Sequence, residues 1–296
     1  MASNLQARIK NIFGNDALDW LDRSYLTDWV IVATLWILSE LAANLPVFER
    51  DFYVADQTIN HAHKKSQING TVNHFIALLV PGAAVLAWGL IRLSFVAIHH
   101  GALALLAGRG LSRLFTNILK NRVGRLRPDF LARCKWDEVA LACTGKKNAV
   151  LDGRRSFPSG HSSAVFAGMT FLSLWLAGQT AAWCFQTPLP VASLRSSRLL
   201  RFVLSLLPLC WATFVAITRL EDYRHHKEDV IGGAVLGAVC STICYVAFWP
   251  SPFSARSFTS YSYGQPRLIT HGENGRLRQG NFDFELTRLE EDDMDV

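Results

Sequence analysis

The sequence predicts an all-α, polytopic membrane protein whose helices cross a bilayer six times. Half of the 296 residues are hydrophobic and only 18% are charged, a balance that soluble domains rarely show. The apolar residues are also grouped into runs of about 20, the length that a helix needs to cross the hydrocarbon core of a membrane. A six-transmembrane-helix bundle is therefore the expected fold.

The predicted spans differ in how cleanly they follow the pattern. The last one carries no charge, whereas the third contains Arg109 and Arg113. The fourth and fifth are short, and we expect them to extend further at either end. The six spans are Trp29–Phe48, Phe75–Phe95, His100–Leu119, Ser162–Leu176, Phe202–Ile217 and Val230–Trp249.

Charges inside two of these spans call for partners, because a charge in mid-bilayer is costly unless it is paired or faces a cavity. Glu40 in the first span and Arg109 in the third each lie about ten residues, or roughly 15 Å at helical rise, from the predicted cytoplasmic end. We hypothesise that these two side chains pair. In the alternative, Arg109 and Arg113 line a wet vestibule or extend to the interface.

An even number of spans leaves both termini on one side, which the distribution of basic residues makes cytoplasmic. No signal peptide is evident, so the first span is expected to act as a signal anchor. We expect residues 1–28 to be cytoplasmic, 29–249 to form the catalytic membrane domain, and 250–296 to be a disordered tail. The residues that support this orientation under the positive-inside rule are Arg8, Lys10, Arg23, Arg92, Arg195, Arg198 and Arg201.

The long loop Lys120–Arg155 is richly basic although it lies on the opposite side. Either the spans are miscounted, or its cations bind an anionic phosphate group, which we favour. Within it, Arg122 or Arg125 taken by itself is interpreted as a residue that marks the membrane boundary. Two further features fit a lumenal or extracellular loop: Asn69 begins an Asn-Gly-Thr glycosylation sequon, and Cys134 and Cys143 can pair in an oxidising compartment.

Three polar segments at the ends of the spans fall on one face of the membrane. The third span ends at Lys120, the fourth begins at His161, the fifth ends at Arg219 and the sixth begins at Asp229. Alternation of the spans brings these four ends to the same side, whichever way the protein inserts. Residues about 110 positions apart are therefore expected to form one site.

The residue types in these segments suit a phosphoryl group. Arg127 offers a planar fork of donors, and Lys120 and Arg219 add two further cations. Ser159 and Gly160 open the fourth span, where the free backbone N–H groups of a helix N-terminus attract anions. These five residues are the predicted phosphate binders.

Two histidines and a carboxylate supply the predicted chemistry. His225 precedes Asp229 by four residues, so on a helix Asp229 would accept one imidazole N–H and leave the other nitrogen free to attack phosphorus. His161, in the opposite segment, would protonate the leaving oxygen. Phosphoryl transfer otherwise needs mainly positioning and charge stabilisation.

These residues resemble the type 2 phosphatidate phosphatase superfamily, which also contains vanadium haloperoxidases. Its motifs are a Lys followed after six residues by Arg-Pro, then Pro-Ser-Gly-His, then Ser-Arg with a His and an Asp at fixed spacing. Thr218 stands where the family has Ser, and it keeps the hydroxyl. The matching residues are Lys120, Arg127, Pro128, Pro158, Ser159, Gly160, His161, Arg219, His225 and Asp229.

The resemblance implies a six-span bundle and a metal-independent phosphatase with no cofactor. It implies that His225 forms a phosphohistidine, that Asp229 orients it and that His161 is the acid. The surrounding sequence is similar to lipid phosphate phosphatases, the fungal diacylglycerol pyrophosphate phosphatases in particular. The implied substrates are phosphatidate, lysophosphatidate and diacylglycerol pyrophosphate, in an endomembrane, vacuolar or plasma membrane.

Four other functions are weighed against this one. A head-group transferase that uses a lipid alcohol as acceptor shares the first chemical step, and a polyprenyl or sphingoid-base phosphate phosphatase shares both. A non-catalytic relative that only binds lipid phosphates would be expected to lose motif residues, and all of them are present here. The six spans argue against a haloperoxidase. The basic residues form no soluble basic face, so no nucleic-acid partner is expected.

Overall fold

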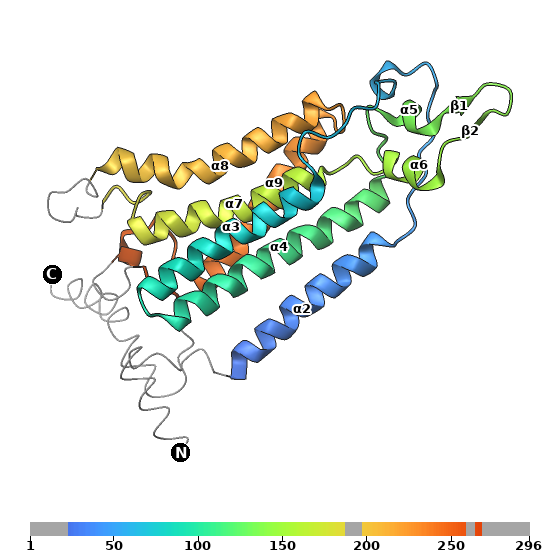
Figure 1. The fold of residues 1–296 in the computed structure, drawn as a ribbon. Helices are drawn as coiled ribbons and strands as arrows, with labels where there is room; N and C mark the ends of the chain where they lie inside the picture. The colour runs from blue at the N-terminus through green and yellow to red at the C-terminus, as the bar shows by residue number, and fades with distance from the viewer. Residues whose placement is uncertain (1–22, 187–196, 259–263, 268–296) are drawn as a thin grey trace, which may run out of the picture. The chain divides into compact units, whose positions relative to one another are not determined.

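Six long helices run through the part of the chain that the computed structural model describes, residues 23–186, 197–258 and 264–267 (Figure 1). They are α2 (Arg23–Ala43), α3 (Gly70–Ile91), α4 (Phe95–Val123), α7 (Gly160–Thr180), α8 (Arg198–Glu221) and α9 (Lys227–Phe248). The shorter elements are η2 (Gln57–Ile59), α5 (Phe130–Cys134), β1 (Trp136–Asp137), β2 (Ala142–Cys143), α6 (Lys147–Gly153) and η4 (Ala255–Phe258). The two strands pair antiparallel.

Four of the long helices, α2, α3, α8 and α9, are long and apolar enough to cross a membrane. The other two are as long but less apolar, because α4 carries Arg109 and Arg113 and α7 is rich in Ser, Gly and Thr. The predicted all-α class is therefore right, with four candidate spans, and six crossings remain a proposal.

Each predicted span lies mostly within one long helix, but two spans run well past the end of theirs. The first span was expected to reach Phe48, whereas α2 ends at Ala43, shortly before Pro46, a residue that disfavours helix in the residue before it. The second was expected to reach Phe95, which instead begins α4 after Ser94 caps that helix. Hydropathy alone does not register these breaks, because the residues around them are still apolar.

Helix α7 is the central helix of the bundle and contacts α3, α4, α8 and α9. Its composition explains this position, since small residues let neighbouring backbones approach closely. A Cβ atom on Gly168 would overlap the carbonyl group of Ala77 in α3, and one on Gly237 of α9 would overlap the Ser163 carbonyl of α7. Small and weakly polar side chains lower the hydropathy of α7 and also permit its burial.

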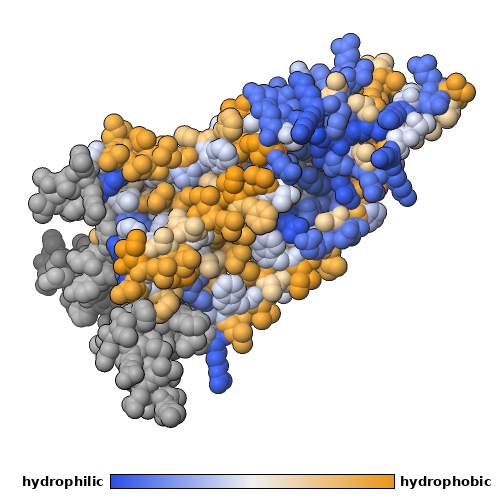
Figure 2. All heavy atoms as spheres, in the orientation of Figure 1, coloured by the Kyte–Doolittle hydropathy of each residue, from blue (hydrophilic) through white to orange (hydrophobic). Residues whose placement is uncertain are grey.

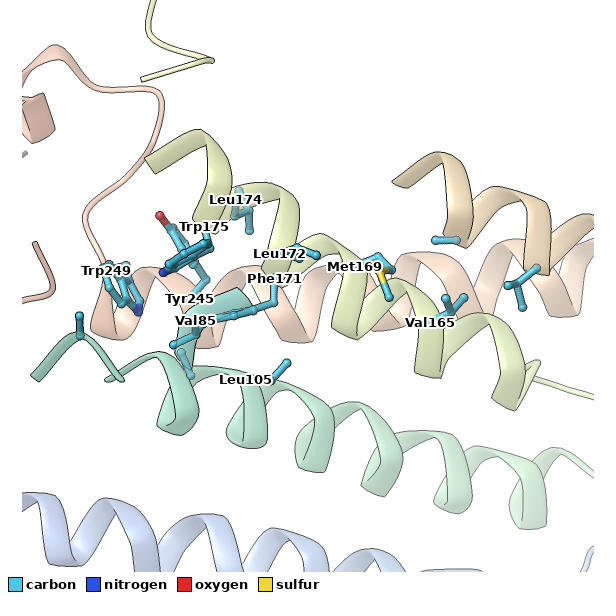
Figure 3. Packing of buried hydrophobic residues seen from close by; sticks show 14 residues of the cluster. Val85, Leu105, Val165, Met169, Phe171, Leu172, Leu174, Trp175, Tyr245 and Trp249 are labelled. Atoms are coloured by element: carbon cyan, nitrogen blue, oxygen red, sulfur yellow. The ribbon is translucent and has the colours of Figure 1, made fainter. Parts of the chain in front are cut away.

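The apolar core lies between these helices, toward the end of the bundle away from α5 and α6 (Figures 1 and 3). Val85 of α3, Leu105 of α4, Phe171 and Trp175 of α7 and Tyr245 of α9 are all buried in it. Between membrane helices, close packing of this kind contributes more to helix association than exclusion of water does, because lipid tails are as apolar as the side chains themselves.

The outer surface is apolar along the bundle and hydrophilic at the end that carries α5 and α6 (Figure 2). Large apolar side chains are exposed on the candidate spans, among them Leu41, Leu79, Leu207 and Ile231. Exposed apolar area on this scale marks a surface that meets something other than water. A bilayer around the bundle, with the hydrophilic end outside it, fits this pattern.

The hypothesised pair between Glu40 and Arg109 is wrong. Glu40 Oε1 instead pairs with Arg113 Nη1 at 2.5 Å, and Arg109 donates to the Ala164 carbonyl and to His74 Nδ1 at 2.6 and 3.1 Å. The helices begin earlier than the predicted spans, at Arg23 and Phe95, and this changes the depths. Counted from the true starts, Glu40 is level with Arg113, one helical turn beyond Arg109.

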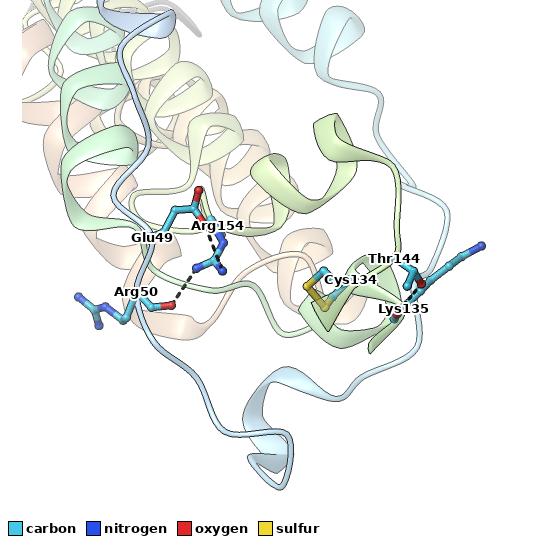
Figure 4. Close-up of a disulfide and its surroundings, with 7 residues drawn as sticks. Glu49, Arg50, Cys134, Lys135, Thr144 and Arg154 are labelled. Carbon is cyan, nitrogen blue, oxygen red and sulfur yellow. Dashed lines mark hydrogen bonds and ion pairs between the residues drawn. A yellow bond between two sulfur atoms is a disulfide. The ribbon is translucent and has the colours of Figure 1, made fainter. Parts of the chain in front are cut away.

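Two long connections meet at the hydrophilic end: the α2–α3 connection (residues 44–69) and the α4–α7 connection (residues 124–159). Arg154 joins them, as its Nη1 donates to the Arg50 carbonyl at 2.8 Å and its Nη2 lies 3.5 Å from Glu49 (Figure 4). The two connections therefore form one layer over the ends of the helices.

The packed part of the chain extends past the predicted domain limit at Trp249. Phe258 of η4 is buried against Ala181 and Cys184, just after α7. Most of the predicted N-terminal segment and of the tail, residues 1–22, 259–263 and 268–296, lies outside the described residues.

Candidate active site

The predicted site residues come from four helix ends that meet at the hydrophilic end of the bundle. Lys120 lies in the last turn of α4, Gly160 begins α7, Arg219 lies in the last turn of α8 and Asp229 lies in the first turn of α9 (Figure 1). His225 lies in the short connection between α8 and α9. The structure thus brings together segments that are distant in sequence.

His225 and Asp229 are neighbours, but they do not share a helix face. His226 is the N-cap of α9, so His225 precedes the helix, and the Asp229 carboxylate turns back to accept the His226 backbone N–H at 3.0 Å. This is a capping arrangement, which the helical assumption overlooked. His225 Nδ1 lies 3.8 Å from Asp229 Oδ2, which is longer than a hydrogen bond.

Two residues that were not among the predicted site residues contact Asp229. The Ser156 hydroxyl donates to Asp229 Oδ2 at 2.5 Å and lies 3.5 Å from His225 Nδ1. Arg125 Nη1 donates to Asp229 Oδ1 at 2.8 Å, and its Nη2 bonds Glu228 at 3.0 Å. Arg125 is therefore part of the site rather than a marker of the membrane boundary. Arg125 lies within the polar segment Lys120–Pro128 and Ser156 begins the segment Ser156–Ser162, and these positions were the available signal.

His225 is electrostatically suited to remain neutral. It is 4% exposed, and burial lowers its pKa to about 3. The Asp229 carboxylate raises the pKa of His225, whereas the nearby cations Arg127 and Lys120 lower it further. An imidazole that is unprotonated at neutral pH has a free lone pair on one ring nitrogen, as a nucleophile requires.

The N-terminus of α7 faces Lys120. Ser159 is the N-cap, and a Cβ atom on Gly160 would lie 3.4 Å from Lys120 Nζ, so the ammonium group sits against this first turn. The His161 carbonyl accepts from Asn73 Nδ2 at 3.1 Å. The His161 ring nitrogen Nε2 is buried without a hydrogen-bond partner among the described residues. A cation, free helix N–H groups and an unpaired imidazole nitrogen therefore adjoin one another.

Arg127 is held by a carboxylate. Its Nη2 pairs with Asp152 Oδ1 at 2.8 Å, and the other oxygen of Asp152 accepts from Arg133 Nη1 at 2.6 Å. Arg133 also pairs with the fully buried Asp129 at 2.9 Å. The side chain of Arg127 is thus fixed in orientation, with its Nε buried and unpartnered within the described part of the chain.

Arg219 is buried, and each of its three guanidinium nitrogens has a partner. Nε and Nη2 donate to the Thr218 hydroxyl at 3.1 and 2.8 Å, and Nη2 lies 3.1 Å from Asp222. Nη1 donates to Ser66 Oγ, in the α2–α3 connection, at 2.6 Å. The Thr218 hydroxyl therefore orients Arg219, a role that Ser at this position would serve equally well.

The two other predicted features lie in the same layer. Cys134 and Cys143 form a disulfide that joins α5 to β2 (Figure 4). Asn69 is exposed and is the N-cap of α3, where its side-chain oxygen accepts the Thr71 N–H at 2.9 Å. Within the described residues, no group of His, Cys, Asp and Glu has the arrangement to hold a metal ion.

The fold and the site define a mostly helical membrane protein that gathers cations and two histidines at one end of its bundle. The chain belongs to the PAP2 superfamily, whose profile matches residues 101–252.

Named relatives agree with this assignment. The chain is similar to "Lipid phosphate phosphatase 2" of Arabidopsis thaliana, with 31% identity over 82% of this chain and 83% of the relative. It is 35% identical to "Diacylglycerol pyrophosphate phosphatase 1" of Saccharomyces cerevisiae, over 75% and 80% of the two chains. "Phospholipid phosphatase 2" of Homo sapiens is 31% identical over 74% and 83%. No solved structure matches the chain.

Proposed function

We propose that this protein is a lipid phosphate phosphatase that works through a phosphohistidine, without a metal ion. Its substrates would be phosphatidate, lysophosphatidate or diacylglycerol pyrophosphate. The convergence of His225, His161 and three cations at one end of an apolar bundle carries this proposal. The names of its relatives support the substrate class.

In the first step, the phosphoryl group binds among Lys120, Arg127, Arg219 and the first turn of α7. His225 attacks phosphorus through Nε2, so that an N–P bond forms and the bond from phosphorus to the lipid oxygen breaks. The leaving oxygen takes a proton from His161. The cations stabilise the charge that builds on the phosphoryl oxygens.

In the second step, His161 accepts a proton from water as the water oxygen attacks phosphorus. The N–P bond breaks, phosphate leaves, and His225 returns to its neutral form. Both steps use the same two histidines, one on each side of the phosphorus atom.

We also propose six crossings, with α4 and α7 as the additional spans and the catalytic end outside the cytosol. The disulfide and the exposed Asn69 support this orientation, as they lie at the catalytic end. Arg92 at the end of α3 and Arg198 at the start of α8 lie at the other end of the bundle, where the positive-inside rule favours cations.

The test is phosphate release by the detergent-solubilised protein with EDTA present, from phosphatidate, diacylglycerol pyrophosphate and a sphingoid-base phosphate. Wild type should release phosphate, and His225→Ala should not. His100→Gln is the matched control, because His100 is another buried histidine. It lies in the half of α4 away from Lys120 and bonds to Tyr25 of α2. Release that persists in His225→Ala would overturn the mechanism. Turnover that needs a lipid alcohol acceptor would identify a transferase instead.

A further inference from the structure

A serine hydroxyl lies between the proposed nucleophile and its carboxylate. Ser156 Oγ is 2.5 Å from Asp229 Oδ2 and 3.5 Å from His225 Nδ1. The direct separation of His225 Nδ1 from Asp229 Oδ2 is 3.8 Å. Each of the two contacts through the hydroxyl group is therefore shorter than the direct separation, and both are within hydrogen-bond distance.

Asp229 is not free to turn toward His225. Its Oδ1 accepts from Arg125 at 2.8 Å, and its Oδ2 accepts from the His226 backbone N–H at 3.0 Å as well as from Ser156. The carboxylate is completely buried, so each of these bonds would be costly to break without a replacement. A direct bond to His225 would have to displace the cap of α9.

Ser156 is fixed just as firmly. It is completely buried, and its backbone N–H donates to the Arg125 carbonyl at 2.9 Å. Its only hydroxyl proton is donated to Asp229, which leaves the oxygen lone pairs as acceptors for the His225 ring. The hydroxyl can therefore receive an N–H from Nδ1 but cannot donate to it.

We propose that Ser156 is a positioning residue for His225, an inference that rests on the proposed role of His225 as nucleophile. His225 Nδ1–H donates to Ser156 Oγ, and Ser156 O–H donates to Asp229. This chain fixes the proton on Nδ1 and leaves the lone pair on Nε2, the nitrogen that attacks phosphorus. The 3.5 Å contact is long in the free protein, and catalytic hydrogen bonds of this kind often tighten when substrate binds.

No proton needs to leave this hydrogen-bonded series of His225, Ser156 and Asp229 during the reaction. When Nε2 bonds to phosphorus, the imidazole gains positive charge while Nδ1 keeps its proton. The negative charge of Asp229 stabilises that cation through the polarised hydroxyl of Ser156. When water later breaks the N–P bond, the lone pair returns to Nε2, and the hydrogen bonds are as they were.

The experiment compares Ser156→Ala and Ser156→Thr with wild type in kcat, in KM and in the amount of alkali-stable phosphohistidine trapped on quenching. Loss of a group that orients a metal-bound imidazole costs about 10- to 100-fold in activity, and we expect an effect of the same order for a nucleophilic imidazole. We expect a fall of that size in kcat and in trapped intermediate for Ser156→Ala, with KM within about threefold of wild type. The Thr variant keeps a hydroxyl and should recover most of kcat.

Ser173→Ala is the matched control, because Ser173 is also completely buried and donates to a carbonyl, that of Ser205, within the bundle. It should change thermal stability without changing kcat. If Ser156→Ala does not fold, Ser156→Cys, which has nearly the same shape and a weak S–H donor, should show the same fall in kcat in a folded protein.

The two proposals fail in different ways. Wild-type kcat in Ser156→Ala together with an inactive His225→Ala would overturn the role of Ser156 alone. A fall in Ser156→Ala that Thr does not recover would also overturn it, since the hydroxyl would not be the cause. Activity in His225→Ala would overturn the phosphohistidine mechanism itself.

Discussion

Removing the Cys134–Cys143 disulfide should loosen the loop that it closes. The bridge spans a sequence separation of 9 residues. In the chain-entropy treatment, a loop of this length loses about 2.5 kcal/mol of stabilisation when the bridge is cut. Because about 1.4 kcal/mol corresponds to a factor of ten, the open population of the loop should rise by up to about 70-fold.

Trypsin cleavage after Lys135 measures this opening, as Lys135 is the only basic residue between the two cysteines. Its carbonyl accepts from the Thr144 hydroxyl at 2.7 Å, so the strand pair must open before a protease can bind (Figure 4). The double variant Cys134→Ser, Cys143→Ser should be cleaved tens of times faster than wild type. The free and exposed Cys210 provides the control variant, Cys210→Ser.

The same loop affects the site through α5. Arg133, next to the disulfide, holds Asp152, which in turn holds Arg127. We therefore expect the double variant to show a several-fold higher KM for lipid phosphate. Cleavage at the wild-type rate would refute the entropy argument, and unchanged KM with fast cleavage would refute the link to Arg127.

Three further predictions concern pH and packing. Because the folded pKa of His225 is about 3 and its unfolded value about 6.5, the unfolded state binds the extra proton between these values and stability falls as pH falls. Between pH 6.5 and 5 the wild type should lose about 2 kcal/mol more than His225→Gln, measured by denaturation at both values. Gly168→Val should lower the thermal midpoint strongly, because the side chain would overlap the Ala77 carbonyl. Glu40→Gln should lower it by only a few degrees, since Glu40 lies in the last turn of α2, near the hydrophilic end of the bundle, where water screens the pair with Arg113.

Each of these has a contrary outcome. Equal pH dependence in wild type and His225→Gln would show that His225 is not buried as a neutral ring. A wild-type midpoint in Gly168→Val would mean that α3 and α7 are not in close contact. If Glu40→Gln lowered the thermal midpoint as much as Gly168→Val does, the pair of Glu40 with Arg113 would contribute far more to stability than a screened ion pair should.

The sequence allowed the helices and the convergence of the motifs to be predicted, for a simple physical reason. Apolar runs fix where helices cross the bilayer, and alternation then fixes which helix ends share a face. The ends at Lys120, Gly160, Arg219 and Asp229 follow from this rule, without any knowledge of side-chain packing.

What could not be predicted depends on rotation and on local hydrogen bonds. Pairing Glu40 with Arg113 rather than Arg109 required helix starts accurate to one turn. The separation of His225 from Asp229 depended on where α9 begins, because a cap and a helical turn use the same carboxylate differently. Ser156 lies outside the spacing rule, since its partner is 73 positions away.

The engagement of Arg219 also has a consequence for product inhibition. Every nitrogen of its guanidinium already has a partner in Ser66, Thr218 or Asp222, and Arg127 is likewise paired with Asp152. In the proposed mechanism, phosphate must exchange places with these internal acceptors rather than fill a vacant site. Such an exchange weakens the net binding of every phosphate group, that of the lipid and that of the released product alike. Free phosphate, which lacks the apolar chains that hold a lipid at the bundle, should therefore leave the site readily.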